Sequence, residues 1–480
     1  MLMEPIDVMR CPIQKLPVET LTEIFRWYCS SDWDWDFSVT LDRPGRLVTK
    51  MKEISGTCSA WHQIICSDSS FWSSFNLELQ CITNVGQSVL LNTFISRSGS
   101  VHLLRLYVSY PQSDIIDSQE LENARLVILG ILLDQSSRWR DVRLYIAPDI
   151  FGRAVSYLTQ RPKPVHGYFP NLERLNSSDQ DSTAEEYQEP NSDRSLFHIF
   201  YPCPALKRLS VHDVWNGNPI DCSRLTSLDL ITYRGNSLSS LLSRCLHLRR
   251  FSIAYWDIPE VEDPDYEGFR PWSNSHPFQH LNLTTLSLPM YTEEFNSDIW
   301  EDVRFPSLNA LEVDQVEESE TGIPELLVML TDSRCSLQTL ILGEMSPDVF
   351  KEFLSITPSL VILTLTSHYT FRALQRQLKM LAPLFGTDSE LPAPKLSCLT
   401  IKFSETFEGF RSISEHIHDM LISRRRRPES IRIKAQYRSE ARSTLMAISF
   451  ASLRDYFDLN TISVSGTTKS QDYFNLELRL

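Results

Sequence analysis

One pattern of apolar side chains recurs along most of this 480-residue chain and limits the folds that it can adopt. A large apolar residue is followed three positions later by a second one and two positions after that by a third. The last three positions alternate as a short β-strand requires, because successive side chains along a strand point to opposite faces. The clearest copies begin at Leu206, Leu225, Leu248, Leu283, Leu308, Leu337, Leu360 and Leu396, and looser copies begin at Trp72, Val101, Trp139 and Leu459.

Helix-like segments lie between these copies, at residues 237–246, 324–333, 347–356 and 371–385. The first residues of successive clear copies are 19 to 36 positions apart, which brackets the period of leucine-rich repeats. A unit of one strand and one helix leaves an apolar face on each until the next unit stacks on it. We therefore predict an α/β fold in which a parallel sheet lies inside and helices lie outside. An unrelated α/β domain is the alternative.

The N-terminal part predicts a separate helical unit. Leu21, Ile24, Phe25 and Tyr28 follow helical spacing, and Pro17 suits the first position of that helix. A second helical stripe is formed by Leu47, Met51, Ile54, Cys58, Trp61 and Ile65. Asp68 or Ser67 can cap a last short turn that carries Phe71 and Trp72. The spacer between the two helices is predicted to be a surface loop whose Trp33, Trp35 and Phe37 fold back on the helices, with an added contact to a partner as the alternative.

The order of these parts resembles the F-box, the helical module by which substrate receptors bind cullin-based ubiquitin ligases. Leu16-Pro17 opens the first helix, Cys58 and Trp61 stand on the second, and Phe71-Trp72 stands on the third. His62 departs from the family, which often has Arg there. The later repeats resemble the degenerate leucine-rich region that follows the F-box in many fungal receptors, and the missing repeat asparagines imply an irregular solenoid.

The resemblance implies an F-box over residues 12–79 with an insertion at 30–46. A leucine-rich-repeat domain would follow over 80–480, with polar loops at 177–195 and 257–277. The F-box would bind a Skp-type adaptor, and through it a cullin, while the repeats would hold an unknown protein substrate. The adaptor-binding residues implied by the resemblance are Leu16, Pro17, Leu21, Ile24, Phe25, Cys58, Trp61, Ile64 and Trp72.

Three functions are compatible with these patterns. The first is the substrate-recognition subunit of a Skp, cullin and F-box ubiquitin ligase, which needs no catalytic residue because it acts by proximity. The second is a non-degradative interaction scaffold that retains the F-box. The third is an enzyme with an unrecognised site, although we find no G-x-S-x-G, H-E-x-x-H, Walker or G-x-G-x-x-G motif, and therefore expect no catalytic residue, metal or cofactor.

Charge and composition exclude other partners. The formal net charge of −15 repels nucleic acid and anionic membranes. Neither a signal-peptide pattern nor an apolar run of membrane length is present, so we expect a soluble protein of the cytoplasm, the nucleus or both. The ten cysteines are scattered singly, which favours reduced thiols. The basic run Arg424 to Arg427 is expected to end a solvated helix, with nuclear import or a phosphate contact as the alternatives.

Overall fold

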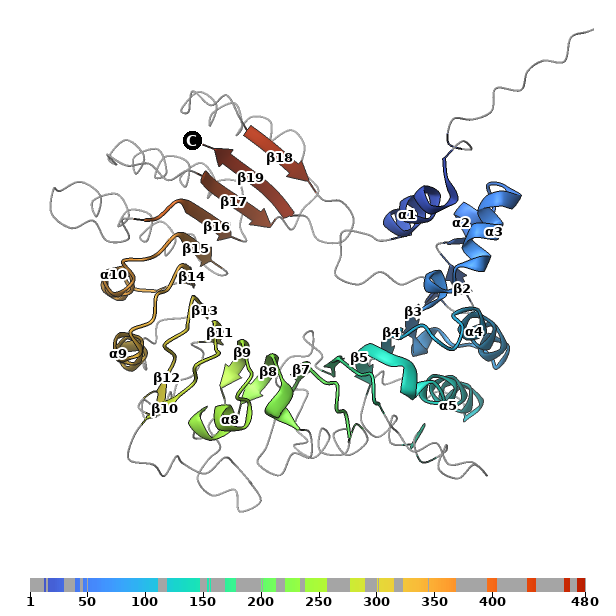
Figure 1. The fold of residues 1–480 in the computed structure, drawn as a ribbon, viewed down its shortest axis with the longest axis horizontal. Helices are drawn as coiled ribbons and strands as arrows, with labels where there is room; N and C mark the ends of the chain where they lie inside the picture. Colours follow the sequence, from blue (N-terminus) through green and yellow to red (C-terminus); the bar gives the residue numbers. More distant parts are fainter. Residues whose placement is uncertain are drawn as a thin grey trace, which may run out of the picture. The chain divides into compact units, whose positions relative to one another are not determined.

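The computed structural model (Figure 1) forms two compact units, Met1–Ser210 with Asn218–Asp221, and Val211–Gly217 with Cys222–Leu480. We call these unit 1 and unit 2. The structure describes residues 13, 16–29, 39–43, 46–49, 51–110, 119–146, 153–154, 156, 169–177, 200, 202–212, 221–233, 238–256, 277–289, 300, 302–314, 323–343, 345–367, 395–403, 430–436, 462–466 and 473–479.

Unit 1 begins with short helices and a small hairpin. These elements are α1 (Val18–Cys29), β1 (Val39–Arg43), β2 (Arg46–Thr49), α2 (Met51–Ser55), α3 (Ser59–Ser67) and the 3-10 turn η2 (Ser69–Trp72). β1 pairs antiparallel with β2 and parallel with β3 (Ser74–Glu78). The interpretation of residues 30–46 as a loop was therefore wrong at its end, because Val39 and Leu41 are buried strand residues.

The second predicted helix is not continuous. Leu47 lies in β2, and the helix ends after Ser55 and begins again at Ser59. Gly56 donates its backbone N–H to the carbonyl of Lys52, and a Cβ at Gly56 would stand only 3.2 Å from that oxygen. Cys58 then has an extended backbone, with φ −161° and ψ 165°, so it precedes α3 instead of lying within a helix. The turn at Gly56 and the extended backbone of Cys58 interrupt the helix between Ser55 and Ser59.

The rest of unit 1 alternates strands with helical segments. In order these are β3, η3 (Leu79–Cys81), α4 (Gly86–Arg97), β4 (Leu104–Tyr110), α5 (Gln119–Leu133), η4 (Ser136–Arg138), β5 (Trp139–Ile146), β6 (Arg174–Asn176) and β7 (Arg208–Val211). β3 to β7 pair in chain order, all parallel. The repeat positions are in register across this sheet: Phe75, Leu106, Val142, Leu175 and Leu209 are successive Cα partners. Helices α4 and α5 lie side by side on one face of it (Figure 1).

Two details of unit 1 differ from the sequence prediction. The pattern missed β6, a strand of three residues. Leu175 within it and Leu172 just before it nevertheless occupy buried repeat positions. The looser copy that begins at Val101 has no buried first residue, because Val101 is 85% exposed while Leu104 and Leu106 are buried. Val101 stands in the turn before β4, where no helix covers it.

Unit 2 repeats the same arrangement. Its elements are η6 (Cys222–Arg224), β8 (Ser227–Tyr233), α8 (Leu238–Arg244), β9 (Arg250–Trp256), β10 (Phe278–Gln279), β11 (Thr285–Pro289), β12 (Val303–Arg304), β13 (Ala310–Asp314), α9 (Ile323–Ser333), β14 (Thr339–Leu342), α10 (Pro347–Ile356), β15 (Ile362–Ser367), β16 (Cys398–Phe403) and β17 (Ser430–Gln436). β8, β9, β11 and β13 to β17 form a parallel ladder, and β10 with β12 forms a separate two-stranded sheet. The predicted helices at 237–246, 324–333 and 347–356 are confirmed as α8, α9 and α10.

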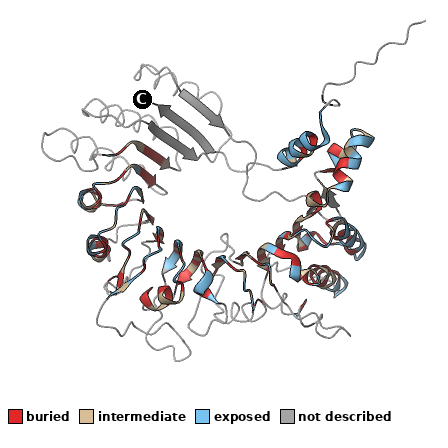
Figure 2. Ribbon diagram, in the orientation of Figure 1, coloured by how far each residue is buried: buried red, intermediate tan, exposed pale blue. Residues whose placement is uncertain are grey.

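The register of unit 2 follows the sequence repeat over eight strands. The successive Cα partners are Leu228, Phe251, Leu286, Leu311, Leu340, Leu363, Leu399 and Ile431. Of these side chains, those from Leu228 to Leu399 are buried, and Figure 2 shows the buried stretches recurring from strand to strand. The fold is therefore α/β, with a parallel sheet and helices on one face of it.

The chain end departs from this pattern. β18 (Ile462–Gly466) pairs antiparallel with β19 (Tyr473–Arg479), which in turn pairs antiparallel with β17. The looser copy that begins at Leu459 therefore does not extend the parallel ladder. A strand that returns directly beside its neighbour must run antiparallel to it, because a parallel connection needs a crossover segment.

A recurring pair of hydrogen bonds fixes the spacing between successive strands. The carbonyl of Arg249 accepts the N–H groups of Thr284 and Thr285, and the carbonyl of Thr284 accepts those of Asn309 and Ala310. The same pair of bonds recurs at the carbonyls of Asn309, Gln338 and Val361. Each strand therefore begins at a position set by the residue just before the preceding strand.

Several predicted features lie outside the described residues. They are the helix at 371–385, the basic run Arg424 to Arg427, the aromatic residues Trp33, Trp35 and Phe37, and most of the loops at 177–195 and 257–277. Among the helices that are described, none has both the length and the apolarity needed to cross a membrane.

The row of buried side chains that runs from Leu228 to Leu399 across unit 2 predicts that a substitution in β14 strongly lowers stability. Leu340 is fully buried between Leu311 and Leu363, so Leu340→Ala should lower the free energy of unfolding by about 2 to 5 kcal/mol. Val328→Ala, at a side chain 61% exposed on α9, should change it by less than about 0.5 kcal/mol. Urea unfolding of both variants measures this, and equal effects would show that the row does not hold the strands together.

Candidate functional site

Helix α1 closes the apolar core of the N-terminal helices. Leu21 and Phe25, one turn apart, are 5% and 3% exposed. They join a cluster that also contains Met51, Ile54, Ile64, Ile65, Phe71 and Trp72, and Ile13, Cys29, Trp61 and Phe94 pack against its border. One side of α1 is therefore enough to complete the apolar core of the N-terminal helices.

Two aromatic contacts position the helices around this core. The ring of Phe25 meets Trp61 edge-on, with centroids 4.8 Å apart at 61°. Trp72 stacks on Phe94 of α4 with centroids 5.5 Å apart, and Arg97 lies 4.7 Å above the Trp72 ring. The Trp72 Nε1–H also donates to the Ile65 carbonyl at 3.0 Å. Trp72 therefore joins the helical unit to the first helix of the repeats.

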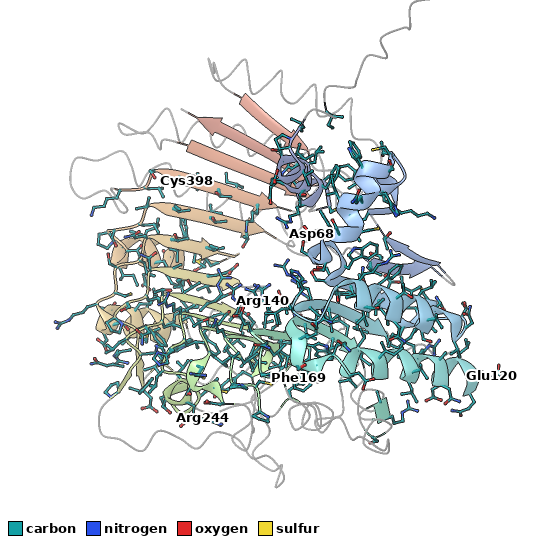
Figure 3. The ribbon with its side chains drawn as sticks, turned by 45° about the vertical axis from the view of Figure 1, so that its right-hand side comes forward. Asp68, Glu120, Arg140, Phe169, Arg244 and Cys398 are labelled. Atoms are coloured by element: carbon teal, nitrogen blue, oxygen red, sulfur yellow. The ribbon has the colours of Figure 1, made fainter. Side chains whose placement is uncertain are left out.

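A charged group fastens α1 to the turn that follows α3. Arg26 donates from Nη2 to Asp68 Oδ2 at 2.9 Å, and Asp68 Oδ1 accepts the Ser70 N–H at 2.9 Å, as the capping prediction for Asp68 required. Burial alone raises the pKa of Asp68, but the hydrogen bonds from Ser70 and the Arg26 guanidinium together lower it below its ordinary value. Figure 3 labels Asp68, which lies where α1 passes the end of α3.

A neighbouring side of α1 carries large apolar side chains that the core does not cover. Ile24, Trp27 and Tyr28 are 38%, 77% and 59% exposed. Their i, i+3, i+4 spacing places them on one side of the helix. Pro17, which immediately precedes the helix, is also exposed. We call these four residues the α1 outer surface. Leu16, 36% exposed, and Val18, 58% exposed, stand at its N-terminal end.

The structure divides the predicted adaptor-binding residues into two groups. Leu16, Pro17 and Ile24 are exposed, and Cys58 and Trp61 are partly exposed. Leu21 and Phe25, expected to present part of their surface to the adaptor, are instead buried in the helical core. Ile64 and Trp72, expected to complete or support the interface, are buried there as well. The physical reason is the 100° step of a helix: Leu21 and Phe25 share one side, whereas Ile24 and Tyr28 point to a neighbouring side.

Sequence reasoning missed the residues that make this surface most apolar. Trp27 and Val18 were not among the predicted site residues, and Tyr28 was assigned to the helix stripe only. The available signal was position, because Trp27 follows Ile24 by three residues and precedes Tyr28. A tryptophan beside a buried stripe widens the apolar part of a helix beyond what its core needs.

Side chains of metal-binding types and cysteines also occur elsewhere in the described residues. These residues contain no group of three or more His, Cys, Asp or Glu side chains placed to hold a metal ion. No disulfide bond joins any two of the nine cysteines among them. Burial raises the pKa of the Cys203 thiol to about 12, so this sulfur stays protonated and unreactive.

No protein-family model matches the chain, and no curated protein matches its sequence.

The Asp68 contacts predict a pH-dependent stability. Because the pKa of Asp68 is lower in the folded chain than its ordinary value of 3.8, its ionised form stabilises the fold above that value, and the stabilisation is lost as the pH falls through the lowered pKa. The difference in melting temperature between wild type and Asp68→Asn should be largest above about pH 5 and should shrink towards about pH 3.

The control for this experiment is Glu23→Gln. Glu23 also forms an ion pair with Arg26, but its side chain is 70% exposed, so the variant should melt close to wild type. A difference for Asp68→Asn that stays constant across the pH range would show that the charge of Asp68 does not fasten α1.

Proposed function

We propose that this chain is the substrate-binding subunit of a Skp, cullin and F-box ubiquitin ligase. In this proposal the N-terminal helices are an F-box that binds a Skp-type adaptor, and the strand and helix units are an irregular leucine-rich-repeat solenoid that binds the substrate. The single observation that supports it most is the α1 outer surface. It stands on the same short helices whose residue order resembles the F-box.

The α1 outer surface has the properties of a protein interface. Its side chains add nothing to the core, since Leu21 and Phe25 already close it from α1. Interface cores are rich in aromatic residues, and tryptophan and tyrosine are frequent among the residues that contribute most to binding. The α1 outer surface has this composition, because the exposed Trp27 and Tyr28 lie beside Ile24. A contiguous exposed apolar patch on a helix favours a protein partner over solvent.

The repeats supply what a receptor needs without catalysis. Within each unit, neighbouring parallel strands are joined by backbone hydrogen bonds and by a buried row of side chains. Such a surface attached to an adaptor-binding module holds a substrate near the conjugating enzyme and raises the effective concentration of its lysines. This chain would therefore contribute binding and position, while other subunits perform the transfer.

The test of adaptor binding uses a surface variant that spares the core. Ile24→Asp combined with Trp27→Ala should weaken binding to a purified Skp-type adaptor at least about tenfold, because it replaces an apolar anchor and adds a charge to the contact. Val328→Asp, an equally outward position 61% exposed on α9, is the matched control and should bind like wild type. Melting curves of both variants verify folding. Unchanged binding of the double variant would refute the F-box assignment.

A second experiment separates a degradative receptor from a scaffold. Proteins that the chain captures in cells should have longer half-lives when the wild-type chain is replaced by the Ile24→Asp, Trp27→Ala variant, because they lose contact with the ligase. Half-lives are measured after blocking synthesis, with Val328→Asp as the control. If the double variant no longer binds the adaptor and the half-lives are still unchanged, the complex is a non-degradative scaffold.

A further inference from the structure

Four neighbouring strands of unit 1 bring arginine side chains to one row. Arg105 of β4, Arg174 of β6 and Arg208 of β7 occupy equivalent strand positions, with Asp141 of β5 between the first two as their Cα partner. The leucines that alternate with them are buried towards the helices, so this row belongs to the face that the described helices do not cover. Since neighbouring strands are about 4.8 Å apart, the row spans about 14 Å.

Three further cations border this row. Arg143 follows Asp141 by two positions on the same face of β5. Arg140 and Lys207 stand where β5 and β7 begin, and they donate to the two oxygens of Glu173 at 2.9 and 3.0 Å. Their side chains are still 49% and 57% exposed. We define the arginine face by its six cations, Arg105, Arg140, Arg143, Arg174, Lys207 and Arg208, and Figure 3 labels Arg140 within it.

Asp141 shows how closely these cations gather. Burial raises the pKa of its carboxyl, and this effect exceeds the opposing influence of four guanidinium groups, those of Arg174, Arg105, Arg143 and Arg140. The Nε of Arg174 is 3.6 Å from Asp141 Oδ1, and the Asp141 side chain is only 18% exposed. Among the described residues, the carboxylates of Asp141 and Glu173 lie between these cations and contact them. The six cations gather in this way within a chain whose net charge is −15.

An aromatic pair adjoins the arginine face. Tyr107 and Tyr145 follow Arg105 and Arg143 by two positions on β4 and β5, so they point to the same side of the sheet. Their ring centroids are 5.2 Å apart. Together the two features offer a positive row beside an apolar platform, which suits a partner that carries anionic groups on a chain with some apolar surface.

We propose that the arginine face binds an extended segment of a partner protein rich in aspartate and glutamate. A span of about 14 Å matches roughly four residues of extended chain, and guanidinium groups hold carboxylates by paired hydrogen bonds. Carboxylates are also the anions that these cations contact in the structure, at Asp141 and Glu173. The proposal deepens the proposed function by assigning a substrate class, acidic peptide segments, to the repeat surface, and it rests on that function.

The experiment measures fluorescence anisotropy of a labelled ten-residue peptide of alternating Asp, Glu and Ser, with the full chain in solution. The same sequence with Asn and Gln is the neutral probe. Arg105→Glu with Arg208→Glu should weaken binding of the acidic peptide at least about tenfold, and added salt should weaken wild-type binding. Arg250→Glu is the matched control, because Arg250 is an exposed strand arginine of unit 2 with Ser227 and Thr285 as its Cα partners.

Several outcomes would overturn the proposal. These are failure of the wild-type chain to bind the acidic peptide, equal binding of the neutral probe, an equal loss in Arg250→Glu, and tighter binding of a single-stranded RNA. Binding of a phosphoserine peptide without binding of the acidic one would assign the face to another ligand. Arg105→Gln with Arg208→Gln repeats the test if melting shows that charge reversal unfolds the sheet.

Adaptor binding is measured on the same variants. The arginine variants should retain wild-type affinity for the Skp-type adaptor, whereas Ile24→Asp with Trp27→Ala should retain the acidic peptide. If the wild-type chain binds the adaptor but not the acidic peptide, only the assignment of the arginine face has failed. If it binds the acidic peptide but not the adaptor, only the proposed function has failed.

Discussion

The structure depends on the match between a leucine row and a hydrogen-bonding register. At the start of most described strands of unit 2, two backbone N–H groups meet a single carbonyl that precedes the neighbouring strand. This contact sets the register, and the register brings Leu311, Leu340 and Leu363 side by side. A slip of one residue would turn every inward side chain to the other face of the sheet. Backbone and side chains therefore support the same arrangement, and strands of only a few residues suffice.

Because backbone hydrogen bonds and the leucine row set the register, the residue types on the other face of each sheet can vary. Positions that alternate with the leucines do not belong to the buried leucine row, so their chemistry can differ from one part of the chain to another. In unit 1 they include the cations of the arginine face. In unit 2 the equivalent positions of β15 and β16 include Thr364 and Thr400, which are mostly buried but uncharged. The proposed binding of acidic segments is thus a property of a few strands and not of the repeat itself.

In the N-terminal helices, helix α1 buries large apolar side chains on one side and exposes others. A short helix has two long sides, and α1 uses one of them, with Leu21 and Phe25, to complete the core. Its other side keeps Ile24, Trp27 and Tyr28 in contact with water. Trp72 belongs to the core of the helices and also stacks on Phe94 of α4, so the helices are held on the repeats by the same residue that fills their interior. A partner bound to α1 would be carried at a fixed position relative to the first strands of unit 1.

Sequence by itself determined the repeat, its strands and three of its helices, because inward leucines at fixed spacing leave a strand only one register that buries them. It also indicated the cap at Asp68. The break after Gly56, the strand β1 and the three-residue strand β6 needed the tertiary structure, since neighbouring strands and not local preference stabilise such short elements. The same holds for both proposed surfaces. Trp27 is a surface residue because α1 packs on the core with the side that carries Leu21 and Phe25. Arg105, Arg174 and Arg208 are far apart in the sequence, and only the parallel register places them in one row.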